Sequence, residues 1–422
     1  MALLIIAFLI MIMLKFPIFV ALGGASVLAV FLKSETLMPM VTQRMLHGLD
    51  STPLMAGPFF VLAGAIMVRG KSAERLLTLA REIVCILPGG LGIAMIVTCA
   101  VFGAISGSAN AAILAIGPAM VPSIAKAYND RSFAIGLITL SSTIAIIIPP
   151  SIPMVVYATL ADLSIGRLFM GGFLPGLLIT ALLSVYAYLY GKIKHFPTEN
   201  ISLIRLGKAL KDAALPLSMP VVVLGSIYSG IATPTEAAVI SVFYGLLIEV
   251  IIYRSFKVKD LKPIFLESAM ICGSIFIIIG CASVLASYLL LEGIPLRIAE
   301  AMFKVTTSKW VFLLGVNAFL LVIGCLMDII SATYIFVPLF VGLASVYGID
   351  PYHFALIFMV NMAIGYATPP VGLNLFVVSM VFDVPVSQIV KSVAFPFFMM
   401  LLATALITLF PDITLFLIRL LM

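Results

Sequence analysis

Long, nearly unbroken apolar stretches run through this chain and limit what it can fold into. Leu168 to Leu189 and Trp310 to Met327 contain very few polar side chains. A helix needs roughly 20 apolar residues to cross a membrane, whereas the strands of a membrane barrel alternate apolar and polar residues. Only 10% of the 422 residues are charged and 63% are hydrophobic, which excludes an ordinary water-exposed surface. The sequence therefore predicts an all-α polytopic membrane protein.

Basic residues gather in three short polar segments beside apolar stretches. Short loops rich in lysine and arginine usually stay on the cytoplasmic side of a membrane. We therefore expect these segments to be cytoplasmic, and we expect no nucleic-acid partner. The longest polar stretch, residues 191–212, is too short for a domain with its own core, so any soluble partner must be a separate chain. The three groups are Arg69, Lys71, Arg75 and Arg81; Lys192, Lys194, Arg205, Lys208 and Lys211; and Arg254, Lys257, Lys259 and Lys262.

The cysteines and the beginning of the chain give two further expectations. All 5 cysteines lie in apolar stretches without a Cys-x-x-Cys pair, which predicts free core thiols rather than disulfides or metal ligands. The apolar run from Ala2 to Met13 lacks a basic leader and a cleavage motif. We therefore expect it to be a retained first helix rather than a signal peptide.

Comparison of the chain with itself indicates two related halves. The connection from Lys126 to Arg131 is basic, but its counterpart before Asp350 is not, which predicts opposite orientations in the membrane. Secondary transporters built from inverted repeats bind solute and ions near the membrane midplane, where broken helices of both halves meet. We expect a first inverted repeat over residues 1–200, a cytoplasmic connector over 201–212 and a second repeat over 213–422. At a shift of 220 residues, Pro118, Asp130, Pro149 and Pro150 fall on Pro338, Asp350, Pro369 and Pro370.

Each half contains small and polar residues in the middle of an apolar stretch. In the first half these lie between Gly103 and Asn110, and in the second between Gly324 and Thr333. The pattern predicts re-entrant hairpins near 95–127 and 313–347, whose tips carry unpaired backbone groups that can bind a cation or a carboxylate. The alternative is that these small residues only allow close helix packing.

Asp328 lies at the apolar midpoint of the second half. An ionised carboxylate inside a bilayer costs several kcal/mol unless it meets a cation or a donor, so this residue indicates an ion or proton pathway. It can also be the N-cap of the following helix, and both roles are compatible.

The two Pro-Pro pairs predict unwound backbone opposite the hairpin tips. A proline lacks an N–H group and frees the carbonyl four residues earlier. The pairs would therefore free the carbonyls of Ala145, Ile146, Gly365 and Tyr366 as further cation ligands. Ordinary proline kinks are the alternative, but they explain the duplication poorly.

Three other motifs carry less weight. Ala65 to Ser72 fits a relaxed P-loop pattern but follows no buried strand, so we do not expect nucleotide binding. Thr233 to Glu236 matches a helix capping box, which makes Glu236 mainly structural. The 3 histidines are isolated and no hydrolase motif occurs, so we expect neither an enzyme nor a transition-metal centre.

Together these segments resemble the DctM-type large membrane subunit of the tripartite ATP-independent periplasmic (TRAP) transporters. The resemblance spans nearly the whole chain and implies an elevator-type fold of the ion transporter superfamily, with a scaffold domain, a transport domain and two re-entrant hairpins. The segments on which the resemblance rests are Gly103-Ala-Ile-Ser-Gly-Ser-Ala-Asn-Ala, Ile148-Pro-Pro-Ser-Ile-Pro, Ala232-Thr-Pro-Thr-Glu-Ala-Ala and Ala367-Thr-Pro-Pro-Val-Gly-Leu-Asn.

The resemblance also implies a function and partners. It implies sodium-coupled import of an organic acid, of the sialic acid or C4-dicarboxylate type, across the bacterial inner membrane. A periplasmic binding protein would deliver the solute, a small four-helix (Q-type) membrane subunit would be a separate chain, and sodium would be the coupling ion without any other cofactor. A proton-coupled carrier that titrates Asp328 or Glu236 is the alternative, and a channel or membrane-embedded enzyme fits less well.

The residues that match the family motifs form two groups. The implied sodium ligands are Ser106, Ser108, Asn110 and the backbone of Ile148, Pro149 and Pro150 in the first half, and Asp328, Ser331, Thr333 and the backbone of Ala367, Thr368 and Pro369 in the second. The implied solute contacts are Ser106, Gly107, Ser151, Thr333 and Asn374.

Overall fold

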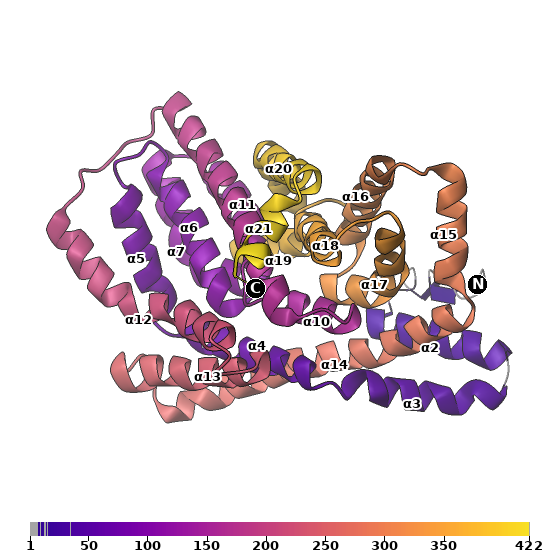
Figure 1. Ribbon diagram of the computed structural model, residues 1–422. Helices are drawn as coiled ribbons and strands as arrows, with labels where there is room; N and C mark the ends of the chain where they lie inside the picture. Colours follow the sequence, from indigo (N-terminus) through magenta and orange to yellow (C-terminus); the bar gives the residue numbers. More distant parts are fainter. Residues whose placement is uncertain (1–6, 9, 12–13, 15, 34, 422) are drawn as a thin grey trace.

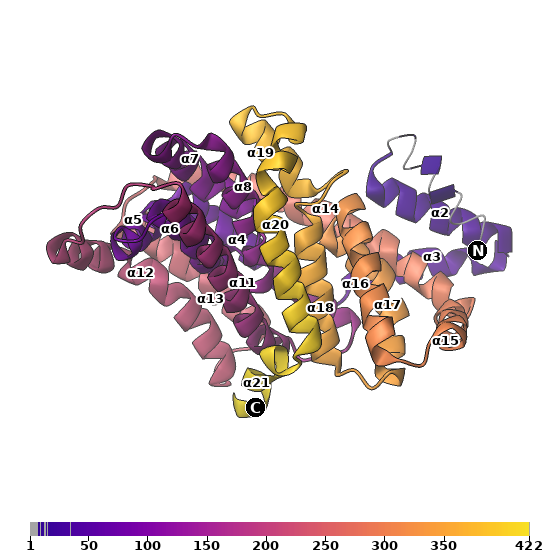
Figure 2. The ribbon, with the colours of Figure 1, turned by 90° about the horizontal axis from the view of Figure 1, so that it is seen from above.

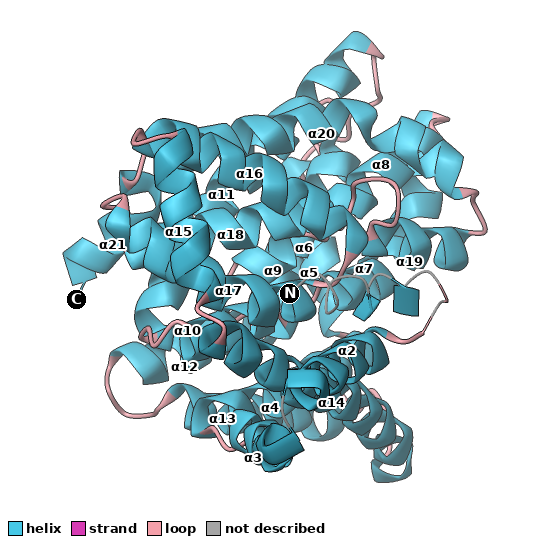
Figure 3. Ribbon diagram, turned by 90° about the vertical axis from the view of Figure 1, so that its right-hand side faces the viewer, coloured by secondary structure: helices cyan, strands magenta, loops and turns pink. Residues whose placement is uncertain are grey.

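The computed structural model describes residues 7–8, 10–11, 14, 16–33 and 35–421. Within these ranges every regular element is a helix (Figure 3). Among them, 9 helices are long and apolar enough to cross a membrane, or 10 if the bent pair 131–160 forms one span. These findings confirm the all-α polytopic class. The predicted first helix over residues 2–13 lies largely outside the described residues.

A lower layer of long helices runs across the bottom of the view in Figure 1. Within it, α4 (Ala56–Arg69) packs against α13 (Pro234–Leu246). The longest helix, α14 (Leu261–Leu291), packs against α2 (Ile18–Lys33) and α3 (Met38–Leu49). We use the name lower layer for these five helices.

An upper bundle of helices from both halves of the chain lies on this layer (Figures 1 and 2). Its centre is α18, in which every residue from His353 to Gly365 is buried. The long helix α11 packs against both α18 and α20, and α8 packs against α20, so the two halves interlock. The bundle consists of α6 (Gly90–Ser106), α7 (Ala109–Tyr128), α8 (Arg131–Ser141), α9 (Ile144–Ile147), α10 (Ile152–Leu160), α11 (Ile165–Ile193), α16 (Lys309–Leu326), α17 (Ile329–Val346), α18 (Pro351–Gly365), α19 (Leu373–Phe382), α20 (Val386–Leu409) and α21 (Asp412–Leu421).

Three helices at the edges of the molecule connect the lower layer with the upper bundle. At one edge, α5 (Ser72–Val84) packs against α12 (Leu203–Tyr228) and against α6 of the bundle. At the other edge, α15 (Ile294–Val305) packs against α14 and α17 (Figure 1). Short helical turns complete the chain: η1 (Glu35–Leu37), η2 (Thr52–Met55), the π-helix η3 (Leu247–Ile252) and η4 (Val258–Asp260).

The helix order is the same in both halves of the bundle. At the shift of 220 residues, α6, α7, α8, α10 and α11 fall on α16, α17, α18, α19 and α20. Both Pro-Pro peptide bonds are cis. Residues 194–202 are irregular and α12 begins at Leu203, so the predicted connector over 201–212 includes the first turns of this helix. The Ser202 hydroxyl caps α12 by accepting a hydrogen bond from the Arg205 N–H (3.5 Å).

Two local predictions are confirmed. All five cysteines are buried and free. The capping box of α13 is also present: the Glu236 N–H donates to the Thr233 hydroxyl oxygen, and the Glu236 carboxylate accepts from the Thr233 N–H (2.7 Å). Such a cap is visible in the sequence because both partners lie within one helical turn.

Glu249 belongs to none of the sequence motifs described above, and it joins α5 to the lower layer. This fully buried carboxylate follows α13 in the π-helix η3. It accepts hydrogen bonds from the backbone N–H groups of Lys71 and Ser72, both at 3.0 Å. It also accepts from the hydroxyls of Ser72 and Ser255. Glu249 therefore satisfies the donors at the amino end of α5 from a distant part of the chain.

We expect Glu249→Ala to lower the free energy of unfolding by about 2–4 kcal/mol, because it leaves the buried N–H group of Ser72 and the partly buried N–H group of Lys71 without an acceptor. Chemical unfolding of the detergent-purified protein measures this loss. The matched control is Glu267→Ala, which removes an exposed ion pair with Arg69 (2.5 Å). That change should cost no more than about 1 kcal/mol. Equal losses in the two variants would contradict the capping role.

Candidate functional site

The tip of the first helix pair is a tight turn between α6 and α7. Gly107 ends α6 in the left-handed region, with φ 58°, and the Ser108 hydroxyl caps α7 by accepting from the Ala111 N–H (3.4 Å). A Cβ atom at Gly107 would lie 2.8 Å from the Pro150 carbonyl oxygen. The turn therefore requires glycine both for its conformation and for its close approach to the first Pro-Pro pair.

The backbone opposite this tip is unwound. Helix α9 ends at Ile147, Ile148 is extended, and α10 starts only after Pro149 and Pro150. All residues from Phe133 to Ala158 are buried, so this break lies inside the protein. The structure thus brings the carbonyl of Pro150, one of the predicted backbone ligands, against Gly107 at the tip.

Two predicted ligands at the first tip carry unsatisfied oxygen atoms. The Ser106 Oγ and Asn110 Oδ1 atoms are buried and have no hydrogen-bond partner among the described residues. A buried polar atom without a partner costs about 1–3 kcal/mol, and such atoms are rare in folded proteins. Side-chain and carbonyl oxygens are the ligands that hard cations prefer. The residues at this tip therefore fit a bound alkali cation.

The tip of the second helix pair is built around Asp328. Helix α16 ends at Leu326, and the Asp328 carboxylate caps α17 by accepting from the backbone N–H groups of Ile330 (3.0 Å) and Ser331 (2.9 Å). The Ser331 hydroxyl donates to the other carboxylate oxygen of Asp328. The N-cap role considered for Asp328 is therefore present, and its half-buried carboxylate keeps lone pairs for a cation.

The second break contacts the second tip directly. The Tyr366 hydroxyl accepts a hydrogen bond from the Ile329 N–H (3.1 Å). The Cys325 carbonyl accepts from the N–H groups of Val371 (3.2 Å) and Gly372 (3.0 Å). In this repeat, however, Pro369 and Pro370 are exposed, whereas the first break is buried. The two equivalent Pro-Pro pairs thus differ in burial.

Close contacts between small residues hold each helix pair against its broken helix. A Cβ atom at Gly103 of α6 would lie 2.5 Å from the Ala145 Cα atom. In the second repeat, a Cβ atom at Gly365 would lie 2.4 Å from the Gly324 Cα atom. The packing role considered for these small residues is therefore present together with the unsatisfied oxygens.

Most of the carbonyls predicted to be free already have partners. The Ile146 carbonyl accepts from the Ser151 hydroxyl (2.6 Å), the Gly365 carbonyl from the Thr368 N–H (3.0 Å) and the Tyr366 carbonyl from the Asn374 N–H (2.9 Å). This corrects the prediction for these three groups. Ser151 and Asn374 follow the proline pairs and Thr368 precedes the second pair, so donors on either side of the prolines replace the missing helical N–H groups.

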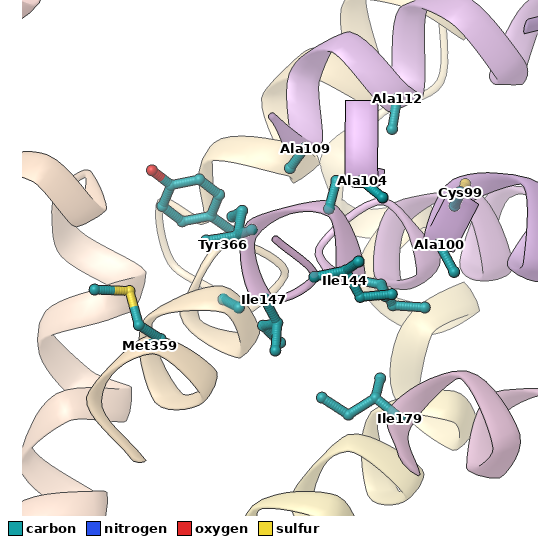
Figure 4. Packing of buried hydrophobic residues seen from close by; sticks show 14 of the residues in the cluster. Cys99, Ala100, Ala104, Ala109, Ala112, Ile144, Ile147, Ile179, Met359 and Tyr366 are labelled. Carbon is teal, nitrogen blue, oxygen red and sulfur yellow. The ribbon is translucent and has the colours of Figure 1, made fainter. Parts of the chain in front are cut away.

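The predicted solute contacts do not all point to one place. Ser106, Gly107 and Ser151 lie at the first tip and break, but the Thr333 hydroxyl donates to the Ile329 carbonyl of its own helix (2.5 Å). Asn374 is fully buried, its Nδ2 donates to the Thr139 carbonyl and to the Ser142 hydroxyl at the end of α8, and its Oδ1 has no partner among the described residues. Figure 4 shows the surrounding apolar cluster, in which Ala104, Ile144 and Ile147 of the first half pack with Met359 and Tyr366 of the second.

Comparison with known proteins gives consistent matches along the chain. The family described as "Tripartite ATP-independent periplasmic transporter, DctM component" matches residues 5–413. The chain is 39% identical over 394 residues to the isethionate TRAP transporter permease protein DctMQ of Oleidesulfovibrio alaskensis, covering 93% of this chain and 62% of that protein. It is 36% identical over 388 residues to the C4-dicarboxylate TRAP transporter large permease protein DctM of Pseudomonas aeruginosa, covering 92% and 91%.

More distant matches agree with these. The chain is 34% identical over 410 residues to the ectoine TRAP transporter large permease protein TeaC of Halomonas elongata, covering 96% of both proteins. The crystal structure of the Alcanivorax borkumensis YdaH transporter has a TM-score of 0.60 with 12% identity, and the match covers 89% of this chain and 88% of that one. This last likeness concerns the fold alone.

Proposed function

Because this chain belongs to the DctM family of tripartite ATP-independent periplasmic transporters, we propose that it imports an organic acid together with sodium ions. As a large TRAP permease subunit it is a multi-pass membrane transporter rather than an enzyme. Its relatives are named for isethionate, C4-dicarboxylates and ectoine. We propose a small organic acid, of the C4-dicarboxylate or sialic acid type, as the solute, and the bacterial inner membrane as the location.

The observation that carries the sodium proposal is the pair of unsatisfied oxygens at the first tip. Ser106 Oγ and Asn110 Oδ1 are buried without a partner among the described residues, and Gly107, which lies between them in the chain, is packed against the Pro-Pro break. These two oxygens belong to neutral side chains, so a proton carrier would have to titrate elsewhere, at Asp328 or Glu236. The second proposed site uses Asp328, Ser331 and Thr333 with the backbone from Ala367 to Pro369.

Charge compensation gives a physical reason for coupling. A carboxylate crosses a low-dielectric barrier at high cost, and sodium ions together with positive helix ends cancel much of its field. The amino ends of α7 and α17 both begin at the hairpin tips, directly after Ser108 and Asp328. In the proposed mechanism, cation binding orders both tips before the upper bundle slides against the lower layer, with α5 and α15 as the connecting arms.

Two partners complete the proposal. A periplasmic binding protein would deliver the solute to the side of the membrane opposite the basic segments. A small four-helix membrane subunit on a separate chain would bind alongside. Solute specificity would then lie partly in the binding protein, which is why the same permease family serves differently named solutes.

Uptake into proteoliposomes tests the proposal. The complex is purified with its binding protein, and a panel of labelled organic acids is offered under an inward sodium gradient, a proton gradient or neither. We expect saturable uptake of one acid only with the sodium gradient and the binding protein. Uptake driven by a pH gradient alone would support the proton carrier instead, and non-saturable uptake without the binding protein would support a channel.

We expect Ser106→Ala to raise the sodium concentration for half-maximal uptake by roughly 5- to 150-fold, the equivalent of losing one ligand worth about 1–3 kcal/mol. The matched control is Ser123→Ala on the exposed side of α7, where the hydroxyl only bonds to the Ala119 carbonyl (2.7 Å). The control should behave as the wild type. An unchanged sodium midpoint in Ser106→Ala would remove this side chain from the site.

A further inference from the structure

Asn374 of α19 reaches across the molecule to the first repeat. Its side-chain Nδ2 donates to the Thr139 carbonyl (3.0 Å) and to the Ser142 hydroxyl oxygen (2.9 Å). A backbone carbonyl can only accept, so the contact with Thr139 identifies which amide atom is the nitrogen. Asn374 is fully buried, as are Thr139 and Ser142. This side chain is therefore a fixed connection between α19 and the end of α8.

The backbone of Asn374 is connected to the second hairpin tip. Its N–H donates to the Tyr366 carbonyl (2.9 Å), and the Tyr366 hydroxyl accepts from the Ile329 N–H (3.1 Å). Ile329 directly follows Asp328 and is the first residue of α17. Any rearrangement of the tip around Asp328 therefore acts on Tyr366 and, through it, on the start of α19.

The other end of the connection leads to the first hairpin tip. The Ser142 hydroxyl donates to the Thr139 carbonyl (3.1 Å), and the Ser142 carbonyl accepts from the Ala145 N–H (3.1 Å). Ala145 packs directly against Gly103. Gly103 lies on the last turn of α6, which ends at Ser106. A hydrogen-bonded and closely packed path thus joins the two tips through Asn374.

We propose that Asn374 is a positioning residue that couples the two cation sites, rather than a solute contact. This inference rests on the proposed binding of sodium at both tips. A cation at Asp328 holds the second tip and Tyr366 in place, so that the Asn374 amide keeps the end of α8 and the first break in the geometry that binds a cation. By thermodynamic necessity the coupling is reciprocal: occupation of the first site strengthens binding at the second. Partial loading is then disfavoured, which a carrier coupled to both ions requires.

Hydrogen–deuterium exchange of the native complex tests the coupling without a known solute. Exchange at peptides covering residues 103–112 and 324–334 is followed while sodium chloride replaces choline chloride. We expect Asp328→Asn to raise the sodium midpoint at residues 103–112, the distant tip, by about fivefold or more, as typical coupling energies imply. In an Asn374→Ala background, Asp328→Asn should leave the midpoint at residues 103–112 unchanged.

Two serine variants make the test specific. Ser142→Ala removes one of the two acceptors of Asn374 and should reduce the effect of Asp328→Asn on residues 103–112, which provides a second test should Asn374→Ala not fold. Ser241→Ala in α13 is the matched control, since this buried hydroxyl also donates to the carbonyl three residues earlier, that of Ala238 (2.6 Å). It should leave the effect of Asp328→Asn intact.

The outcomes separate this inference from the proposed function. Protection of neither tip by sodium in the wild type would overturn the sodium proposal itself. Protection of both tips, with an undiminished effect of Asp328→Asn on residues 103–112 in the Asn374→Ala and Ser142→Ala backgrounds, would overturn the coupling role and leave the sodium proposal standing.

Discussion

Asp328→Asn is expected to lower sodium-driven uptake by at least about tenfold while leaving the protein folded. The Asp328 carboxylate accepts three hydrogen bonds at the tip of the second helix pair. A hydrogen bond to a charged group contributes about 1.5–3 kcal/mol. Asparagine is as good an N-cap as aspartate, so α17 should still form. The negative charge that would attract a cation, however, is lost. Initial uptake rates in proteoliposomes at several sodium concentrations measure the effect.

The chain offers a closely matched control for this variant. Asp350 caps α18 by the same geometry, accepting from the N–H groups of Tyr352 (2.8 Å) and His353 (3.2 Å), but it is exposed at the end of the bundle. Asp350→Asn should transport at the wild-type rate. Wild-type sodium stimulation in Asp328→Asn, or equal losses in both variants, would contradict a specific role of Asp328 in cation binding.

Gly365→Ala is expected to destabilise the protein by about 1–3 kcal/mol and to abolish uptake. The new Cβ atom would lie 2.4 Å from the Cα and carbonyl carbon atoms of Gly324, so α16 and α18 must separate at their crossing point. Backbone cannot move aside as a flexible side chain can. Because this crossing directly precedes both the second tip and the second break, a shift there displaces the proposed ligands. Thermal unfolding and uptake assays on the same preparation measure the two effects.

Gly315→Ala is the control for this substitution. Gly315 lies on the same helix, α16, and a Cβ atom there would meet no described atom within 4 Å. Alanine is favoured over glycine in a helix by about 1 kcal/mol, so this variant should be neutral or slightly stabilised. Similar behaviour of the two alanine variants would show that the crossing of α16 and α18 is less tight than the distances indicate.

Local sequence signals explain which parts of the fold were predictable. The apolar stretches indicate membrane helices because hydrocarbon thickness sets their length, and the capping box at Thr233 lies within a single helical turn. The break at Gly107 follows from glycine's freedom to adopt a left-handed conformation, and the breaks at the Pro-Pro pairs follow from the missing N–H groups of proline. These features need no knowledge of what the segment packs against.

Features that depend on distant packing were not predictable in the same way. Glu249 caps α5 across 177 positions of sequence, and Asn374 reaches the Thr139 carbonyl across 235. Neither residue belongs to a motif that names its partner. The repeated motifs also gave no indication that the first break is buried while Pro369 and Pro370 are exposed, since exposure depends on the surrounding helices.

The most direct test of the central claim is the binding of radioactive sodium to the purified complex at equilibrium. We expect the wild type to bind two exchangeable ions. Ser106→Ala and Asp328→Asn should each weaken a different ion directly, and each should weaken the other ion to a smaller extent through the coupling between the tips. Asp350→Asn and Ser123→Ala should bind as the wild type does. A wild-type complex that binds no sodium at millimolar concentrations, or that loses none in either site variant, would contradict the claim that the two hairpin tips hold the coupling ions.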